Sequence, residues 1–302
     1  MITILGPTAS GKTALAAHVA AALSGEVISA DSRQVYRGMD IGTGKDYGDY
    51  VVNGVVIPYH LIDILDPGYE YNIFEYQKDF LRVYNDILHR KKIPVLCGGS
   101  GMYLEAVLKG YRLVTTKKDE EFLQSLDDKS DDDLVELLKS YKTLHNKTDT
   151  EDRPRLLKAL VIAHQAKQAR GQGIDLNYPG IKSTIIGISY PRGLLKIRIT
   201  ERLETRLNNG MIEEVEGLLK RGIPPKRLMK YGLEYKFVTL FLKGEISRAD
   251  LFFNLNIAIR QFAKRQMTWF RRMERQGFEI HWLDGRMPMD KKLSKIQTIS
   301  PF

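Results

Sequence analysis

The feature that most constrains this chain is a glycine-rich loop near its start. Residues 6–13 read GPTASGKT and match the pattern G-x-x-x-x-G-K-[ST]. An apolar run, MITIL, precedes the loop, and an alanine-rich stretch of high helix propensity, Ala14–Leu23, follows it. Glycines let the backbone surround a phosphate with N–H donors, and the helix N-terminus adds partial positive charge. The pattern therefore predicts a strand, a phosphate-binding loop and a helix.

This loop is expected to bind a diphosphate. Lys12 supplies a point charge, and the Thr13 hydroxyl suits Mg²⁺, which makes Thr13 the expected metal contact and Mg²⁺ the expected cofactor. The loop does not identify the phosphate compound, because a nucleoside triphosphate and a prenyl diphosphate present similar oxygens. The expected diphosphate-binding residues are Gly6, Thr8, Ala9, Ser10, Gly11, Lys12 and Thr13.

Three later apolar runs read as buried strands. VISA (27–30) ends at Asp31, IPVLCGG (93–99) ends at Ser100, and STIIGIS spans 183–189. Helical spacing over 71–91 supplies a crossover helix. Together these patterns predict an α/β fold: a P-loop NTPase-like parallel sheet flanked by helices. The crossover helix is expected to turn one side inward, formed by Phe74, Phe80, Leu81, Tyr84 and Leu88.

The composition and the sequence pattern of the chain change after Arg112. Residues 117–133 are densely charged, and a helical pattern continues to about 168, where RGQG (170–173) and NYPG (177–180) interrupt it. The acidic triplet at 131–133 favours a helix N-terminus over a metal site. We therefore predict a first part of the core at 1–114, a mainly helical insertion domain at 115–182 and a second part of the core at 183–302.

Composition limits the classes of protein that fit. Lys and Arg number 46 against 37 Asp and Glu, and the formal net charge of +9 favours a polyanionic partner. Cys97 is the one cysteine, so no intramolecular disulfide can form, and the six histidines show no zinc-ligand spacing. Cys97 is expected to be a buried strand residue and His60 a structural histidine. With no apolar run long enough for a membrane span and no charged leader, we expect a cytoplasmic protein.

Asp31 is the first candidate catalytic residue, because it ends a predicted strand at the sheet edge where open α/β folds bind ligands. Its residue type alone leaves three roles open: a general base, a Mg²⁺ ligand of the Walker B type, or a helix N-cap. The preceding VISA is less uniformly apolar than a typical Walker B strand. This difference favours the general base.

The chain resembles the tRNA dimethylallyltransferase family, also called the tRNA isopentenyltransferases. The resemblance covers almost the whole chain, and it implies transfer of a dimethylallyl group from dimethylallyl diphosphate to N6 of the adenosine at tRNA position 37, with release of diphosphate. The motifs that carry it are GPTASGKT (6–13), DSRQVYRGMDIGTGK (31–45), CGGSGMYLEAVLKG (97–110), DRPRLLKAL (152–160), RITERL (198–203), IRQFAKRQMTWFRR (259–272) and HWLD (281–284).

The resemblance also implies roles for single residues. Asp31 would take the proton of the attacking amine, since a neutral exocyclic amine is a poor nucleophile. Lys12, Arg202 and Mg²⁺ at Thr13 would stabilise the departing diphosphate. Ser100 stands where the family usually has Thr and would orient the reacting groups. The expected catalytic residues are thus Asp31, Thr13, Ser100 and Arg202.

A predicted helix near the C-terminus separates basic from apolar residues. Arg260, Lys264 and Arg271 share one face, and Phe262, Trp269 and Met273 share the opposite face, which we expect to point into the core. From the residues alone the basic face reads as a solvated surface, whereas the resemblance implies contact with RNA. Trp269 as a platform for base stacking is the less favoured alternative to Trp269 in the core.

The resemblance implies further RNA contacts. Asp31, Ser32, Arg33 and Gln34 match the segment that meets the target nucleotide, with Gln34 able to pair with a base edge or to act as a simple loop residue. Arg155 matches a second RNA-contacting segment. The implied partners are the tRNA anticodon stem-loop, lodged between the core and the insertion, and dimethylallyl diphosphate. Nothing in the sequence calls for a protein partner or a membrane.

The chain departs from the family pattern at several positions that concern RNA recognition. Phe122 stands where many members have Arg, the RPR of DRPR replaces PQR, and Leu233 and Glu234 replace a tyrosine and a basic or acidic residue. Gly44 replaces a frequent alanine, which we expect to be neutral. These differences affect contacts with the anticodon loop and leave the transfer chemistry unchanged.

Three other functions compete with tRNA prenylation. An adenylate isopentenyltransferase would use the same donor on a free nucleotide, but the basic helix and the long insertion disfavour it. An RNA-binding P-loop paralogue without prenyl transfer is disfavoured by intact Asp31, Lys12 and Thr13. A small-molecule kinase has only the phosphate loop in its favour.

Overall fold

The computed structural model describes residues 1–111, 119–141, 150–171 and 178–300. The chain forms two compact units, one made of Met1–Lys109 with Ile181–Phe302 and the other of Gly110–Gly180. The predicted boundary at 114/115 lies outside the described residues. Among the described residues, no helix combines the length and apolar character that crossing a membrane requires.

A parallel sheet forms the centre of the first unit, as predicted, and it has six strands. Leu5 pairs with both Gly98 and Gly187, and Ala30 also pairs with Gly98, so four strands end at nearly the same level. The order is β5 (Tyr59–His60), β2 (Glu26–Ala30), β6 (Pro94–Gly98), β1 (Ile2–Leu5), β7 (Thr184–Ser189) and β8 (Ile280–Asp284). The sequence patterns predicted the four central strands and missed the two edge strands.

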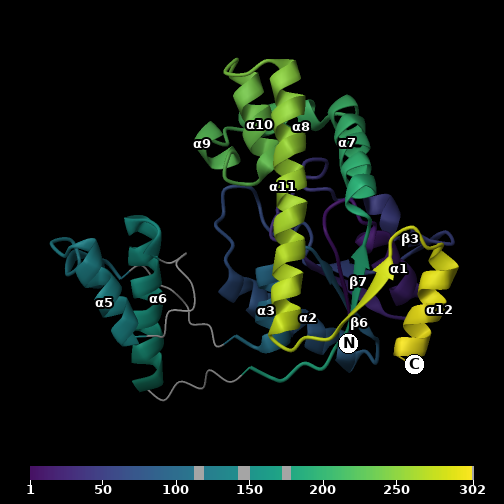
Figure 1. The fold of residues 1–302 in the computed structure, drawn as a ribbon, viewed down its shortest axis with the longest axis horizontal. Helices are drawn as coiled ribbons and strands as arrows, with labels where there is room; N and C mark the ends of the chain where they lie inside the picture. The colour runs from purple at the N-terminus through teal and green to yellow at the C-terminus, as the bar shows by residue number, and fades with distance from the viewer. Residues whose placement is uncertain (112–118, 142–149, 172–177, 301–302) are drawn as a thin grey trace. The chain divides into compact units, whose positions relative to one another are not determined.

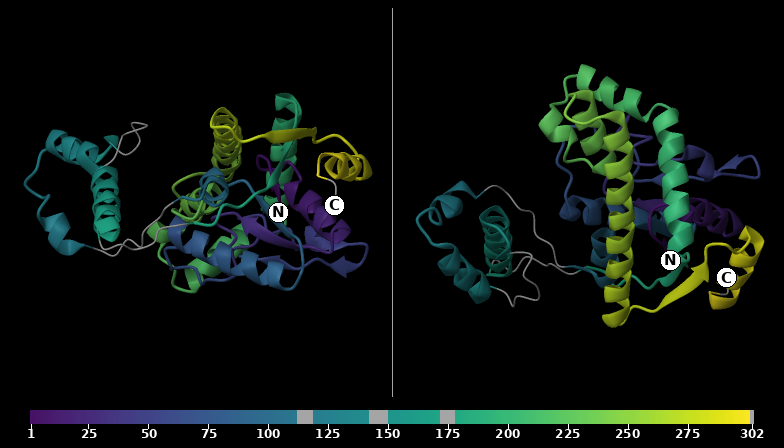
Figure 2. Two further views of the ribbon diagram at one scale, coloured as in Figure 1. Left: turned by 90° about the horizontal axis from the view of Figure 1, so that it is seen from below. Right: turned by 45° about the horizontal axis from the view of Figure 1, so that its top comes forward.

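Helices cover both faces of this sheet. The alanine-rich α1 (Lys12–Ala22) packs on β1, β2 and β6 and contacts α12 (Met289–Ile299) (Figure 2). On the other face, α2 (Ile73–His89) contacts β2, β6 and α3 (Gly101–Lys109). A short 3-10 helix, η1 (Tyr47–Tyr50), and an antiparallel hairpin of β3 (Val51–Val52) and β4 (Val55–Val56) extend the α1 side.

The inward side of α2 differs in part from the prediction. Phe80 is fully buried as expected, but Leu88 is 43% exposed. The buried stripe of α2 consists of Tyr76, Gln77, Phe80, Val83 and Ile87. Leu88 lies outside this stripe near the end of the helix, so its predicted inward position is wrong. Phe74, Leu81 and Tyr84 are half-buried at the margins of the stripe.

A helical cluster extends the first unit beyond the carboxyl edge of the sheet (Figure 1). It has its own core, in which Leu203, Val215, Val238 and Leu255 are buried. Its longest helix, α11 (Arg248–Arg275), runs back from this cluster to contact α3. The helices are α7 (Arg192–Asn208), α8 (Met211–Lys220), α9 (Pro225–Leu228), α10 (Leu233–Leu242) and α11 (Arg248–Arg275).

The second unit is helical in its described part, with α4 (Glu120–Gln124), α5 (Asp131–Tyr141) and α6 (Arg153–Gly171). A small leucine-rich core that includes Leu134, Leu138 and Leu160 holds these helices together. The acidic triplet begins α5, and Ser130 Oγ accepts a hydrogen bond from the backbone N–H of Asp133, which confirms the predicted helix N-terminus. Phe122 stacks on the ring of His164, with the ring centroids 3.9 Å apart.

Candidate active site

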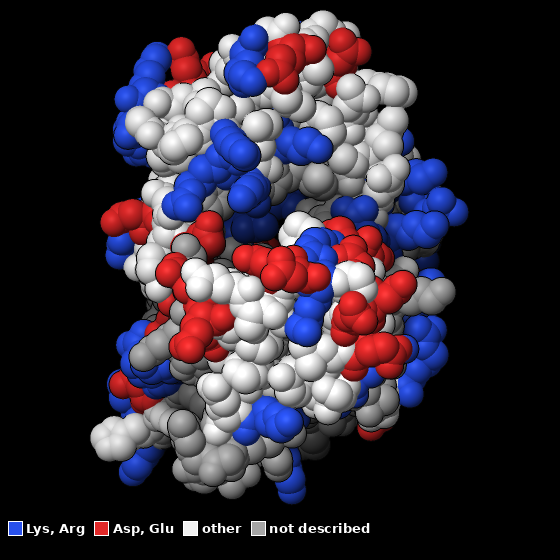
Figure 3. Space-filling view, turned by 90° about the vertical axis from the view of Figure 1, so that its left-hand side faces the viewer, with Lys and Arg blue, Asp and Glu red and all other residues white. Residues whose placement is uncertain are grey.

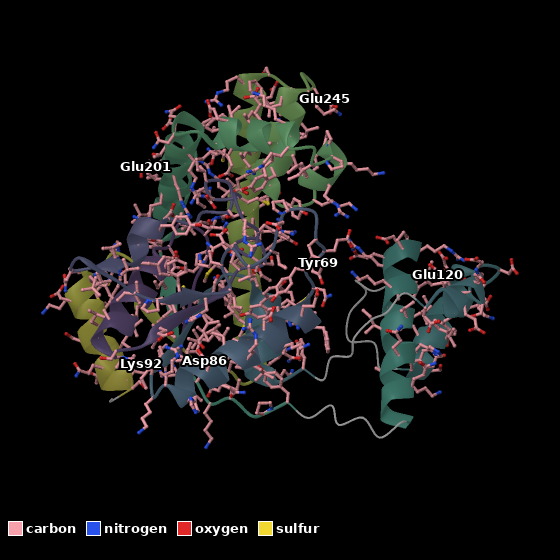
Figure 4. All side chains as sticks on the ribbon, turned by 180° about the vertical axis from the view of Figure 1, so that it is seen from behind. Tyr69, Asp86, Lys92, Glu120, Glu201 and Glu245 are labelled. Carbon is pink, nitrogen blue, oxygen red and sulfur yellow. The ribbon has the colours of Figure 1, made fainter. Side chains whose placement is uncertain are left out.

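A cavity of about 720 Å³ lies in the first unit at the carboxyl edge of the sheet. The loops after β1, β2 and β6 line it, together with residues of α7, α10 and α11. In Figure 3, Lys and Arg side chains are frequent in the upper half of the face shown. Lys92, labelled in Figure 4, precedes β6 and so marks the opposite edge of the sheet. The predicted residues that line the cavity are Thr8, Lys12, Thr13, Asp31, Ser32, Arg33, Gln34, Ser100 and Arg202.

The phosphate loop leads into α1 as the pattern predicts. Gly11 is the N-cap of α1 with φ of 77°, and Ala9 is also left-handed, with φ of 60°. Lys12 and Thr13 line the cavity from the first turn of α1. Burial lowers the pKa of Lys12, and the nearby Arg202 adds to this effect. A lysine without a carboxylate ion pair among the described residues is suited to bind a phosphate oxygen.

The rest of the loop is less exposed to the cavity than expected. Ser10 is 2% exposed and Ala9 is 8% exposed. The backbone N–H of Thr8 donates to Gln266 Oε1 at 2.8 Å, so this amide is already used within the protein. Gly6, Ala9, Ser10 and Gly11 do not line the cavity, and any contact from them would come through the backbone.

Two arginines of α7 stand over the phosphate loop. Arg202 donates through Nη1 to Thr8 Oγ1 at 3.3 Å and through Nη2 to Asp46 Oδ2 at 2.9 Å. Arg206, one helical turn further on, lies 3.3 Å from the same carboxylate. Burial lowers the pKa of Arg202, and the charge of Arg206 contributes to the shift. Arg206 and Asp46 are not among the residues predicted from the sequence, although the spacing of four residues from Arg202 puts Arg206 on the same helix face.

Asp31 lies directly after β2, beside the loop that follows β6. Its Oδ1 accepts a hydrogen bond from the backbone N–H of Arg33 at 2.9 Å. The backbone N–H of Ser32 donates to Ser100 Oγ at 3.2 Å, which ties the two loops together. Turns and not a helix follow Asp31, so the N-cap alternative is wrong. The carboxylate faces the cavity and can accept a proton from a bound ligand.

The described residues offer few ligands for a metal ion. No group of three or more His, Cys, Asp or Glu among them is placed to hold one. Mg²⁺ usually retains several waters and binds through one or two protein oxygens plus substrate phosphates. The Thr13 hydroxyl at the cavity wall fits that kind of site, in which the substrate completes the coordination.

Gln34 is buried, and half of the hydrogen-bonding capacity of its amide is already used within the protein. Gln34 Oε1 accepts from Ser29 Oγ at 3.0 Å, and its Nε2 donates to Gly44 O at 3.2 Å. One hydrogen and one lone pair of the amide remain for contact with a base. Arg155, the other predicted contact in this group, lies in the second unit, where it pairs with Glu151 and Asp152.

The apolar face predicted for α11 does not all point into the core. Met273 is buried, but Phe262 is 39% exposed, and Phe262 and the half-buried Trp269 both line the cavity. The expected core positions of Phe262 and Trp269 are therefore wrong. The buried stripe is turned by a fraction of a helical turn, because it also includes Ile259, Ala263, Gln266 and Phe270.

The predicted basic face of α11 lines a separate groove. Arg260, Lys264 and Arg271 face a cavity of about 540 Å³ between α11 and α7, and Arg192 and Lys196 of α7 also line it. We call this cavity the basic groove, because no Asp or Glu is among its lining residues. Because these residues lie on the side of α11 opposite Phe262 and Trp269, they do not line the cavity that holds Asp31.

Leu233 and Glu234, two departures from the family pattern, line the main cavity at the start of α10. Burial raises the pKa of Glu234, and the positive charges of Arg206 and Arg202 oppose this shift. Next to them, Tyr235 donates to Glu214 Oε1 at 2.7 Å. The same carboxylate accepts hydrogen bonds from three backbone N–H groups of residues 40–42 and so fixes the loop that carries Gly44.

Two further expectations concern Cys97 and His60. Cys97 is buried in β6, and burial raises the pKa of its thiol to about 12, which makes it a poor nucleophile. His60 Nε2 lies 2.7 Å from Glu26 Oε2 in an edge pairing of the sheet. Both residues have the structural roles that the sequence analysis predicts.

Comparison with known proteins places the chain in one family. Residues 34–273 match the family described as IPP transferase, and residues 1–53 match isopentenyl transferase. tRNA dimethylallyltransferase 1 of Parabacteroides distasonis is 55% identical over 99% of this chain and 97% of its own length. tRNA dimethylallyltransferase 2 of Phocaeicola vulgatus is 54% identical over 98% and 96%.

A solved structure agrees with these sequence matches. The crystal structure of a tRNA delta(2)-isopentenylpyrophosphate transferase from Staphylococcus epidermidis superposes with a TM-score of 0.67 and 32% identity, covering 98% of this chain and 97% of that one. The family match spans most of the chain, and the relatives align along nearly its whole length. This chain therefore belongs to the IPP transferase family.

Proposed function

We propose that this protein is a tRNA dimethylallyltransferase, which transfers a dimethylallyl group from dimethylallyl diphosphate to N6 of the adenosine at tRNA position 37. The observation that carries the proposal is one cavity in which cations for a diphosphate, Lys12 and Arg202, meet a carboxylate suited to deprotonate an amine, Asp31. The names of the relatives, tRNA dimethylallyltransferases, support the same reaction.

In this reaction, different residues of the cavity act on the acceptor amine and on the diphosphate of the donor. A bond forms between N6 of the adenine and the allylic carbon, the bond from that carbon to the diphosphate oxygen breaks, and the N6 proton passes to Asp31. Lys12, Arg202 and Arg206 neutralise the charge that develops on the diphosphate. Mg²⁺ at the Thr13 hydroxyl would add to this neutralisation.

Apolar side chains give the cavity a second function. Met229, Leu233 and Phe262 line it alongside the charged groups. An allylic centre that develops positive charge reacts readily with water, and exclusion of water favours attack by the amine. These side chains provide a surface for the prenyl chain and the adenine. Ser100, held by the Ser32 amide, lies where it can orient the reacting groups.

A tRNA acceptor is supported by charge as well as by the relatives. The formal net charge is +9, and five cations line the basic groove. A target base in an anticodon loop can leave its stack at small cost, which suits attack inside a cavity. With tRNA as acceptor, we place the protein in the cytoplasm.

The decisive experiment is mass spectrometry of nucleosides from unmodified tRNA after incubation with the protein, dimethylallyl diphosphate and Mg²⁺. We expect one prenyl unit on adenosine, mapped to position 37 by fragment analysis. Asp31→Asn should nearly abolish transfer while donor binding persists, and Asp290→Asn, at an exposed position of α12, serves as the matched control. Transfer to AMP but not to tRNA would instead identify an adenylate isopentenyltransferase.

A further inference from the structure

Gln266 joins the two loops that carry opposite halves of the site. It lies in α11 and is 7% exposed. Its Oε1 accepts from the backbone N–H of Thr8 at 2.8 Å, and its Nε2 donates to Gly99 O at 2.9 Å. The two contacts cross 258 and 167 residues of sequence. One side chain thus connects the loop after β1 with the loop after β6.

The chemistry of these two contacts requires an amide. A backbone N–H needs an acceptor and a backbone C=O needs a donor, and a Gln side chain offers both in one plane. The reversed amide would set N–H against N–H and oxygen against oxygen. Glutamate in its ionised form could accept from Thr8 but could not donate to Gly99.

The backbone of the β6 loop is shaped to admit this amide. A Cβ on Gly99 would stand 2.4 Å from Gln266 Nε2, closer than atoms approach without displacement. Glycine at position 99 therefore allows the side chain to reach the backbone. The close approach and the two hydrogen bonds fix the distance between the loops at one point.

Each of the joined loops leads directly to reacting groups. Thr8 precedes Lys12 and Thr13 and accepts a hydrogen bond from Arg202, so its loop belongs to the diphosphate side. Gly99 precedes Ser100, whose hydroxyl accepts a hydrogen bond from the backbone N–H of Ser32, the residue after Asp31. The strands beneath, β1 and β6, are neighbours that end together at Leu5 and Gly98.

We propose that Gln266 is a positioning residue for prenyl transfer, which holds the diphosphate loop and the acceptor loop at the separation that aligns the allylic carbon with the attacking amine. This inference rests on the proposed function. Gln266 also lines the cavity, but its side-chain oxygen and nitrogen are hydrogen-bonded to Thr8 and Gly99, and it acts through these two residues. Displacement of one reactant by 1 Å can lower a rate by about 10²-fold, which sets the scale of its effect.

The test compares Gln266→Glu and Gln266→Ala with Gln297→Glu and Gln297→Ala, at an exposed glutamine of α12. Steady-state kinetics with tRNA and dimethylallyl diphosphate should show kcat lowered by about 10²-fold in both Gln266 variants. KM for both substrates should change by less than about threefold, since uniform binding is not removed. The Gln297 variants should match the unaltered protein.

A pH profile separates positioning from general loss of structure. When protonated, the carboxyl group introduced by Gln266→Glu has an O–H that can donate to Gly99 O. The rate of Gln266→Glu relative to the unaltered protein should therefore rise as the pH falls from about 8 to about 5, because burial raises the pKa of such a carboxyl. Gln266→Ala has no such proton, and its relative rate should stay flat. Equal pH profiles for the two variants, or an unchanged kcat, would overturn the proposal.

Hydrogen exchange tests the contact without relying on turnover. In the unaltered protein the Thr8 amide should exchange slowly, and Gln266→Ala should accelerate exchange in residues 6–10 while exchange in α12 stays the same. Unchanged exchange at 6–10 would overturn the proposed contact. If the unaltered protein shows this protection but transfers no prenyl group, the proposed function fails while the loop connection stands.

Discussion

Gly44 lies directly beneath the guanidinium group of Arg206: a Cβ at this position would stand 2.4 Å from Arg206 Nη2. It would also stand 2.5 Å from Arg202 Nη2, and Gly44 has φ of +75°. An alanine in this conformation is strained by about 1–2 kcal/mol, and both arginines would have to move. The expectation that Gly44 is equivalent to the family's alanine therefore does not hold in this structure.

We predict that Gly44→Ala weakens use of the donor. Displaced arginines bind diphosphate less well, so KM for dimethylallyl diphosphate should rise about tenfold, which corresponds to about 1.4 kcal/mol. Gly48→Ala is the matched control, because Gly48 is close in sequence and a Cβ added there would meet nothing within 4 Å. Identical kinetics for the two variants would show that Arg202 and Arg206 adjust freely.

Asp46 competes with a diphosphate for the same two arginines. Its carboxylate lies 2.9 Å from Arg202 Nη2 and 3.3 Å from Arg206 Nη2. An ion pair of this exposure contributes up to about 1 kcal/mol, so Asp46→Asn should tighten binding of inorganic diphosphate by up to about fivefold. Titration calorimetry measures this effect, with Asp66→Asn as a control outside the cavity. Weaker binding in Asp46→Asn would instead mean that the carboxylate helps to hold a metal ion.

The sequence predicted what depends on local pattern. The loop at residues 6–13, the four central strands and the helix start at Asp131 follow from residue spacing and propensity, and the structure contains all of them. The edge strands β5 and β8 were missed. β5 has only two residues, too few for a periodic signal. The residues HWLD of β8 were recognised as a family motif but not as a strand.

Long-range contacts account for what the sequence did not predict. Gln266 reads as one more polar residue in an amphipathic helix, and only the folded chain shows that it meets Thr8 and Gly99. The prediction of which face of α11 points into the core was wrong for a similar reason. Phe262 and Trp269 are apolar but border a cavity, and hydrophobic periodicity cannot distinguish a cavity wall from a core.

The basic groove gives a prediction for RNA binding. Lys264 and Arg271 line it without an ion pair to any described residue, so they are available to phosphates. If they contact the RNA backbone, Lys264→Gln with Arg271→Gln should lower the slope of log Kd against log salt by about one unit per lost contact. Filter binding with whole tRNA measures the slope, and Lys291→Gln with Lys295→Gln on α12 is the charge-matched control. Equal slopes for the two double variants would assign the groove no RNA contact.

Glu26 predicts how stability depends on pH. Its buried carboxylate accepts hydrogen bonds from Arg90 and His60 at the edge of the sheet. The hydrogen bond from Arg90 is the main reason that the pKa of Glu26 lies below its usual 4.5. Burial opposes this shift, and the hydrogen bond from His60 adds to it. A carboxylate with a lowered pKa stabilises the fold above the pKa of the unfolded chain, and this stability is lost as the pH falls through the folded value.

Glu26→Gln should remove this stabilisation at neutral pH. Loss of a buried, hydrogen-bonded charge costs about 1–3 kcal/mol, so the free energy of unfolding at pH 7 should fall by that amount. As the pH falls below about 4.5 and through the lowered pKa of Glu26 in the folded protein, the unaltered protein loses the same contribution, and the two curves should converge. Urea denaturation between pH 7 and pH 3 measures both curves. Glu201→Gln, at the exposed α7 position labelled in Figure 4, controls for removal of one charge. A constant difference across this range would show that packing of Glu26, and not its ionisation, stabilises the sheet edge.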